Sequence, residues 1–137
     1  MRALTLWQPW ASLVAIGVKT YETRSWSTRY RGQLAIHAAK RRTEYMGGEP
    51  HKTMLSELNA AGIGWLELPL GRIVAICQLV ECFPVEDLWP ELLDLGNEQD
   101  FGNWSAGRYG WELRDIRMID PPIPVKGSRG LWEWRRN

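Results

Sequence analysis

Cysteine and histidine are scarce in this chain, and neither supports a disulfide or a metal site. The sequence contains two cysteines and two histidines. Cys77 and Cys82 lie in one apolar segment, where a strand would direct them to opposite faces and prevent a disulfide. His37 and His51 lack metal-ligand spacing with the cysteines, so we expect no metal ion or other cofactor, and His37 suits a structural role in a strand. This composition predicts a reduced, cytoplasmic protein.

Long apolar runs and several catalytic motifs are also missing. No run approaches the roughly 20 apolar residues of a membrane span, and the opening M-R-A-L-T-L-W lacks the apolar stretch of a signal peptide. We therefore expect no membrane association. There is no G-x-x-x-x-G-K-[ST] loop for phosphates and no G-x-S-x-G nucleophile motif. The remaining composition, 45% apolar and 24% charged, predicts one globular domain over residues 1–137.

The formal net charge of +1 conceals an uneven distribution of charge along the chain. Residues 1–60 hold nine Lys or Arg against four Asp or Glu, and residues 105–137 hold seven against four. Residues 61–104 hold one arginine against eight acids. If the two ends meet in the fold, they form a basic face suited to nucleic acid, whereas the acidic region 61–104 could hold protein partners.

Periodicity and turn residues predict about six strands and three helices. A strand at Leu4–Leu6 precedes a helix over Gln8–Ile16 that ends at Gly17. Arg72–Phe83 is apolar on both faces, which predicts a central strand. The P-P-I-P segment at 121–124 should end the strand that precedes it, Tyr109–Ile119. The irregular order of strands and helices favours an α+β fold, a small mixed β-barrel flanked by helices. The other predicted strands are Lys19–Trp26, Gly32–Ala39, Tyr109–Ile119 and the closing L-W-E-W-R, and the other helical segments begin at Pro50 and Val85.

The densest cluster of ionisable and aromatic side chains is G-V-K-T-Y-E-T-R at 17–24, between L-W-Q-P-W and S-W. On a strand, Glu22 and Arg24 point to the same face about 6.5 Å apart, and Lys19 joins them if it lies in the turn before the strand. Such a cluster can bind an anion, with Arg24 on a phosphate or carbonyl oxygen, Glu22 orienting it or accepting a proton, and Lys19 adding charge. The alternative from spacing alone is an edge-strand ion pair of little consequence.

This cluster resembles the G-x-K-x-x-E-x-R signature of the ASCH (activating signal cointegrator homology) family. Further segments match the family in the same order, so the resemblance covers the whole chain: L-T-L-W-Q-P-W-A-S-L, R-G-Q-L-A-I-H-A-A, G-W-E-L and P-I-P-V-K-G-S-R-G-L-W. The resemblance implies a PUA-like β-barrel, related to domains that bind RNA or modified bases. It also implies that Lys19, Glu22 and Arg24 line a cleft.

Aromatic and basic residues beside these segments extend the predicted site. Tryptophan stacks on bases, and two of the nine tryptophans adjoin the signature or the helix before it. The K-G-S-R-G segment at 126–130 is either an anion-binding loop or a simple turn, and the basic segment 40–52 is either a surface that follows a nucleic-acid backbone or a solvated face. The predicted binding residues are Trp7, Lys19, Glu22, Arg24, Trp26, Lys40, Arg41, Lys126, Ser128 and Arg129.

We therefore predict a domain that binds RNA or another single-stranded nucleic acid. A modified base or nucleoside is a more specific ligand within this prediction. One alternative is a weak ribonuclease in which Lys19, Glu22, Tyr45, Lys52 and Ser128 activate a 2′-hydroxyl or protonate the leaving group. Another follows from the resemblance, because some small bacterial ASCH proteins are amidohydrolases on acetylated cytidine. Their nucleophilic threonine is replaced here by Glu22, a poor acyl acceptor, which disfavours that reaction. A third alternative is a protein-interaction adaptor.

Overall fold

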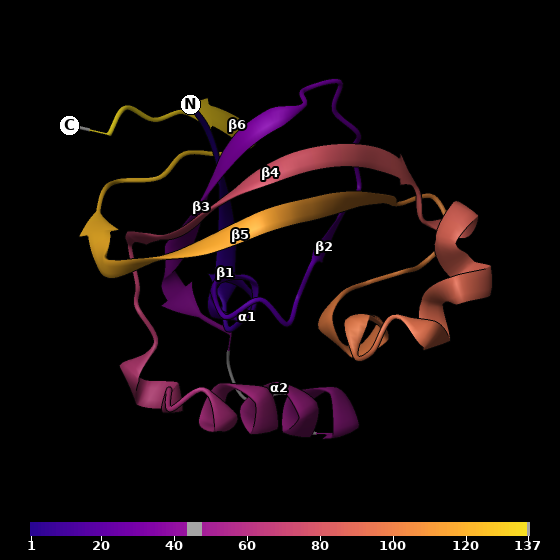
Figure 1. Ribbon diagram of the computed structural model, residues 1–137, viewed down its shortest axis with the longest axis horizontal. Helices are drawn as coiled ribbons and strands as arrows, with labels where there is room; N and C mark the ends of the chain where they lie inside the picture. The colour runs from indigo at the N-terminus through magenta and orange to yellow at the C-terminus, as the bar shows by residue number, and fades with distance from the viewer. Residues whose placement is uncertain (44–47, 137) are drawn as a thin grey trace.

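The computed structural model describes residues 1–43 and 48–136, which form a curved six-stranded sheet with helices against it (Figure 1). Helix α1 packs on one face of the sheet, α2 lies below it in this view, and η2 and η3 form a lobe at the right-hand end. In chain order the elements, with η marking 3-10 helices, are β1 (Arg2–Gln8), α1 (Trp10–Ala15), β2 (Tyr21–Arg24), β3 (Gly32–Arg42), α2 (Gly48–Ala60), η1 (Trp65–Glu67), β4 (Arg72–Pro84), η2 (Val85–Asp94), η3 (Glu98–Phe101), β5 (Tyr109–Pro124) and β6 (Leu131–Glu133).

The strands follow the order β2-β5-β4-β3-β1-β6. β1 and β3 are parallel, and the other neighbours are antiparallel. The predicted α+β class with six strands is confirmed, and β4 lies inside the sheet with residues 73–77 buried, as its apolar pattern predicted. The sheet is not closed, because β2 and β6 form its two edges. The predicted barrel is therefore an open sheet, curved far enough for Arg24 on β2 to donate a hydrogen bond to Thr5 on β1.

Strand β5 continues through the prolines that were expected to end it. Ile123 pairs with Ile73 and Pro124 with Arg72 on β4. β2 covers the other side of β5 only at its start, between Tyr109 and Glu112. The proline-containing part of β5 thus lies at an edge. The register with β4 also shifts between Met118 and Ile123, so Pro121 and Pro122 lie in an irregular part of the ladder, where prolines are tolerated. The prediction that P-P-I-P ends the strand was wrong.

The turn after α1 determines where the 17–24 signature begins its strand. Gly17 has φ of +84°, a left-handed conformation that glycine adopts without a steric penalty. The backbone N–H groups of Val18 and Lys19 both bond to the carbonyl of Leu13. This compact helix stop, predicted from the sequence, places Lys19 in the turn before β2.

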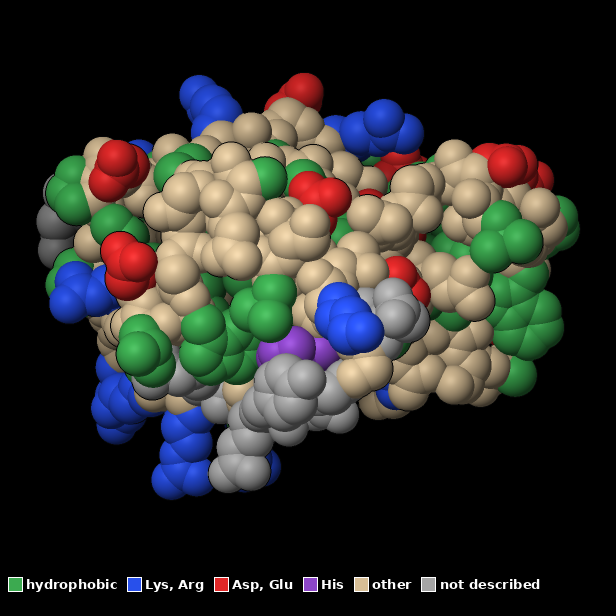
Figure 2. Space-filling view, turned by 90° about the horizontal axis from the view of Figure 1, so that it is seen from below, with side chains coloured by type: hydrophobic (Ala, Val, Ile, Leu, Met, Phe, Trp, Pro, Cys, Tyr) green, Lys and Arg blue, Asp and Glu red, His purple; other side chains and the backbone are tan. Residues whose placement is uncertain are grey.

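Charges are mixed on the face seen from below in Figure 1, where α2 lies. Acidic and basic side chains are interspersed there (Figure 2). Among residues 1–43 and 48–136, no helix is long and apolar enough to span a membrane, and no group of His, Cys, Asp or Glu could hold a metal ion. Cys77 and Cys82 are both free thiols.

Candidate functional site

A cleft of about 430 Å³ opens where the edge strand β2 approaches β1. β6 pairs with β1 from Arg2 to Leu4, and the cleft begins at the next residue, Thr5. We call it the arginine cleft, because it brings three arginines together from β2, from the segment before β5 and from the 126–130 loop. Its lining includes Thr5, Trp7, Trp10, Glu22, Arg24, Arg108, Ser128 and Arg129.

Arg24 is held in the cleft by hydrogen bonds on two sides of its guanidinium. Nε donates to Glu22 Oε2 at 2.9 Å, and Nη2 donates to the Thr5 carbonyl oxygen at 2.8 Å. The side chain is 24% exposed, and its Nη1 group makes no hydrogen bond to a described residue. An arginine fixed in this way can direct its remaining N–H donors at an anion with little further loss of conformational entropy.

The Glu22 carboxylate lies between two cations. Its Oε2 accepts from Arg24, and its Oε1 lies 3.3 Å from Lys19 Nζ. Lys19 is 1% exposed, and its Nζ also donates to the carbonyl oxygens of Tyr21 at 2.5 Å and Phe101 at 3.1 Å. The ammonium group is held by two carbonyl oxygens and one carboxylate oxygen. Lys19 is thus a buried support for Glu22 and does not line the cleft.

Thr5 connects Arg24 to the 126–130 loop. Its carbonyl accepts from Arg24, while its hydroxyl lies 3.1 Å from His37 Nδ1 and 3.3 Å from the Ser128 carbonyl oxygen. His37 Nε2 lies 2.8 Å from the Val125 carbonyl oxygen, which assigns the ring proton to Nε2 and makes Nδ1 the acceptor. Burial lowers the pKa of His37, and the bond to Val125 opposes that shift. His37 thus has the structural role that its strand position predicted.

Sequence comparison decides the family, because the ASCH domain family model matches residues 4–122. The chain belongs to the ASCH domain family. This ASCH chain is 26% identical over 138 residues to activating signal cointegrator 1 of Mus musculus, and 24% identical over 131 residues to that of Homo sapiens. Each alignment covers 95% of this chain and 22% of the relative, so the chain spans about a fifth of these curated proteins.

Solved ASCH structures share the fold. The crystal structure of ASCH from Zymomonas mobilis has a TM-score of 0.59 and 16% identity, covering 98% of this chain and 87% of that one. Two variants of that protein, a tyrosine-to-phenylalanine and a serine-to-alanine form, have TM-scores of 0.59 and 0.56, with 16% and 18% identity. They cover 98% of this chain, and 90% and 88% of theirs. At this identity the likeness concerns the fold.

Five of the predicted binding residues line the arginine cleft: Trp7, Glu22, Arg24, Ser128 and Arg129. Trp7 is 54% exposed, so its indole is accessible to a ligand. They come from β1, from the ASCH signature and from the 126–130 loop. The fold thus brings together segments that lie at the two ends of the sequence.

Other predicted residues lie away from the cleft. Trp26 packs edge to face against Trp111, with ring centroids 4.8 Å apart at 88°. Arg41 on β3 and Lys52 on α2 are exposed. They line neither this cleft nor a second hollow, of about 330 Å³, that lies beside it. Tyr45 lies outside the described residues. Of the four members of the predicted ribonuclease set that the structure describes, the cleft therefore contains Glu22 and Ser128.

Sequence reasoning missed Arg108 and Trp10 as cleft residues. The Nε and Nη2 groups of Arg108 donate to the carbonyl oxygens of Asn103 at 3.1 Å and Thr23 at 3.2 Å, which holds the side chain at the cleft. Trp10 packs against the hydrophobic core and also lines the cleft. No linear motif marks Arg108. The feature that connects Arg108 with the cleft is the strand register, because the next residue, Tyr109, pairs with Arg24.

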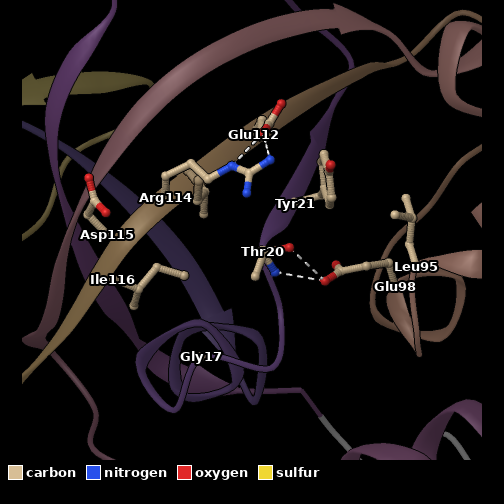
Figure 3. Close-up of a pocket in the computed structure, with 10 residues that line it drawn as sticks. Gly17, Thr20, Tyr21, Leu95, Glu98, Glu112, Arg114, Asp115 and Ile116 are labelled. Carbon is tan, nitrogen blue, oxygen red and sulfur yellow. Dashed lines mark hydrogen bonds and ion pairs between the residues drawn. The ribbon is translucent and has the colours of Figure 1, made fainter.

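A larger pocket of about 460 Å³ borders the outer side of β2 (Figure 3). Glu98 Oε2 accepts from the N–H and the hydroxyl of Thr20, at 2.8 and 3.1 Å, and its buried Oε1 has no partner among the described residues. Burial raises the pKa of Glu98, while the Thr20 hydrogen bonds and the charge of Lys19 oppose the rise. Arg114 lies beside Glu112 on β5, and both its Nε and its Nη2 pair with the Glu112 carboxylate. Arg24 gives Glu22 only its Nε, which favours the arginine cleft as the anion site.

We expect Glu98→Gln to alter how stability depends on pH. Because the folded-state pKa of Glu98 is raised above 4.5, the unfolded chain loses this proton at lower pH than the folded chain does. The unfolding free energy of the wild type should therefore fall, relative to that of Glu98→Gln, as pH rises from 4.5 through the folded-state pKa. Urea unfolding of both proteins between about pH 4 and pH 8 measures this difference. A constant difference across that range would contradict the raised pKa.

Proposed function

We propose that the arginine cleft binds a nucleotide of single-stranded RNA. The observation that carries the proposal is Arg24, which Glu22 and Thr5 hold in the same cleft as the exposed Trp7. The Nη1 group of Arg24 makes no hydrogen bond to the residues that the structure describes, and so can donate to a ligand. A guanidinium can donate two parallel hydrogen bonds to a phosphate. An exposed indole can stack on a base, at a free-energy gain of about 1–3 kcal/mol. Together they match the two chemically distinct parts of a nucleotide.

The charge of the cleft supports an anionic ligand. Among the described residues, three arginines line it, namely Arg24, Arg108 and Arg129, against one acidic residue, Glu22. Lys19 lies 3.3 Å behind Glu22 and offsets its negative charge. The positive charge of the arginines is therefore available for phosphate. ASCH membership, which relates the chain to PUA-like RNA-binding domains, favours RNA over DNA.

The surroundings of Glu22 favour holding a ligand over attacking one. Both carboxylate oxygens face cations that are themselves fixed by protein carbonyls. A carboxylate whose two oxygens are both engaged by cations is poorly placed to attack a ligand. Its role in the proposal is to orient Arg24, and the same geometry disfavours the amidohydrolase alternative.

We expect binding of labelled single-stranded RNA to weaken steeply as salt rises. Each phosphate contact contributes a slope of about −0.7 to log K against log salt, so three arginine contacts predict a slope of roughly −2. Fluorescence anisotropy at several salt concentrations measures this slope, and a double-stranded RNA of the same sequence should bind more weakly, because its stacked bases cannot reach Trp7.

Size analysis of the RNA after incubation separates the alternatives. Intact RNA with salt-dependent binding supports the proposal, whereas shortened RNA would favour the ribonuclease. If no oligonucleotide bound in a salt-sensitive way, the proposal would be contradicted and the adaptor, acting through the acidic region 61–104, would remain.

A further inference from the structure

A second hollow of about 330 Å³ lies directly beside the arginine cleft. The two share Thr5, Ser128 and Arg129 as lining residues. The second hollow adds Lys40 from β3 and Lys126 from the 126–130 loop, and we call it the lysine hollow. No acidic side chain is among the described residues that line it. Both volumes lie near the lower end of the range for small-molecule sites, about 300–1,000 Å³, so each suits one nucleotide-sized group.

The 126–130 loop forms a fixed ridge between the two hollows. A Cβ at Gly127 would lie 2.5 Å from Cε1 and 2.6 Å from Nδ1 of His37, and 2.9 Å from Thr5 Oγ1, so the loop backbone packs directly on these two side chains. The carbonyl of Ser128 lies within hydrogen-bond distance of the Thr5 hydroxyl. The backbone carbonyl of Thr5 accepts a hydrogen bond from Arg24, so Thr5 contacts both the ridge and the arginine of the cleft.

We propose that the lysine hollow binds the phosphate of the nucleotide adjacent to the one in the arginine cleft, so that the ligand spans at least two nucleotides. This inference rests on the proposed function of the cleft. Lys40 and Lys126 come from different elements and both line this hollow, so a phosphate bound there would be attracted by two cations. Arg129 lines both hollows and therefore lies where the chain of a bound RNA would cross the ridge.

Ligand length tests the proposal. We would measure the affinities of uridine 5′-monophosphate and of 5′-phosphorylated oligouridylates of two and four nucleotides, since stacking on tryptophan tolerates any base. Lys40→Met and Lys126→Met should each weaken binding of the two longer ligands by about threefold to tenfold and lower their salt slope by about 0.7. Neither variant should change the affinity for the monophosphate by more than about twofold. Arg117→Met is the matched control, because Arg117 is an exposed cation on β5 that lines a different hollow.

The outcomes separate this proposal from the function on which it rests. If the two lysine variants left all affinities unchanged, or weakened the monophosphate as much as the tetranucleotide, the lysine hollow would have no role in length recognition. The same conclusion would follow if the wild type bound all three ligands equally tightly, and in these cases the proposed function of the arginine cleft would stand. If none of the three ligands bound, both proposals would fail.

Discussion

Lys19→Met should lower the unfolding free energy by about 3–5 kcal/mol, the usual effect of removing one partner from a buried ion pair. Methionine fills similar space but donates no hydrogen bond, so Glu22 Oε1 and the carbonyls of Tyr21 and Phe101 would lose their shared donor. Lys19 is 1% exposed, and little water can replace that donor. Urea unfolding of the variant and the wild type measures the difference.

Lys126→Met is the matched control for this measurement. Lys126 is exposed, so its loss should change the unfolding free energy by less than about 0.5 kcal/mol. A Lys19→Met protein as stable as the wild type would contradict the supporting role of Lys19. If that stable variant had also lost RNA binding, Lys19 would instead contact the ligand directly, as the resemblance to the ASCH signature implied.

Arg24→Ala should weaken binding of single-stranded RNA by about 10- to 100-fold, which corresponds to the loss of charge-assisted hydrogen bonds worth about 1.5–3 kcal/mol. Arg24→Lys should recover little of this affinity. A lysine at this position could pair with Glu22, but it would lack the planar donor group that bonds Glu22, Thr5 and a phosphate at the same time. Anisotropy titrations at one fixed salt concentration compare the three proteins.

Arg31→Ala provides the control for charge alone. Arg31 is an exposed arginine paired with Glu81 at 2.8 Å, and it does not line the arginine cleft. Its removal should change RNA affinity by less than about twofold, the effect of a distant surface charge. Equal losses for Arg31→Ala and Arg24→Ala would show that binding depends on overall charge, and would contradict a specific site in the cleft.

The local elements could be predicted because they depend on neighbouring residues. The stop at Gly17 follows from a backbone conformation that favours glycine, and the interior position of β4 follows from a segment that is apolar on both faces. The failed predictions concern pairing between distant segments. Whether P-P-I-P can belong to β5 depends on how far β2 covers that strand, and closure of a barrel depends on whether the edge strands β2 and β6 pair.

The candidate site divides in the same way. Strand alternation alone predicted that Glu22 and Arg24 share a face, and they form an ion pair with 2.9 Å between Arg24 Nε and Glu22 Oε2. The burial of Lys19 could not be predicted, because one of its partners is the carbonyl of Phe101, which lies 82 residues away. Arg108 belongs to the cleft for a similar reason, since the carbonyl of Thr23 on β2 accepts its hydrogen bond.

By itself, the sequence determined the family, the elements and the residues of the signature that share a face, because these depend on motif order, periodicity and local backbone preferences. The tertiary structure alone decided which charges are buried and which are presented to a ligand. The sheet curves so that β2 approaches β1. As a result, the Thr5 carbonyl accepts a hydrogen bond from Arg24, and the Thr5 hydroxyl faces the loop that carries Ser128. Contacts between such distant segments follow from the packing of the whole chain, and no local pattern encodes them.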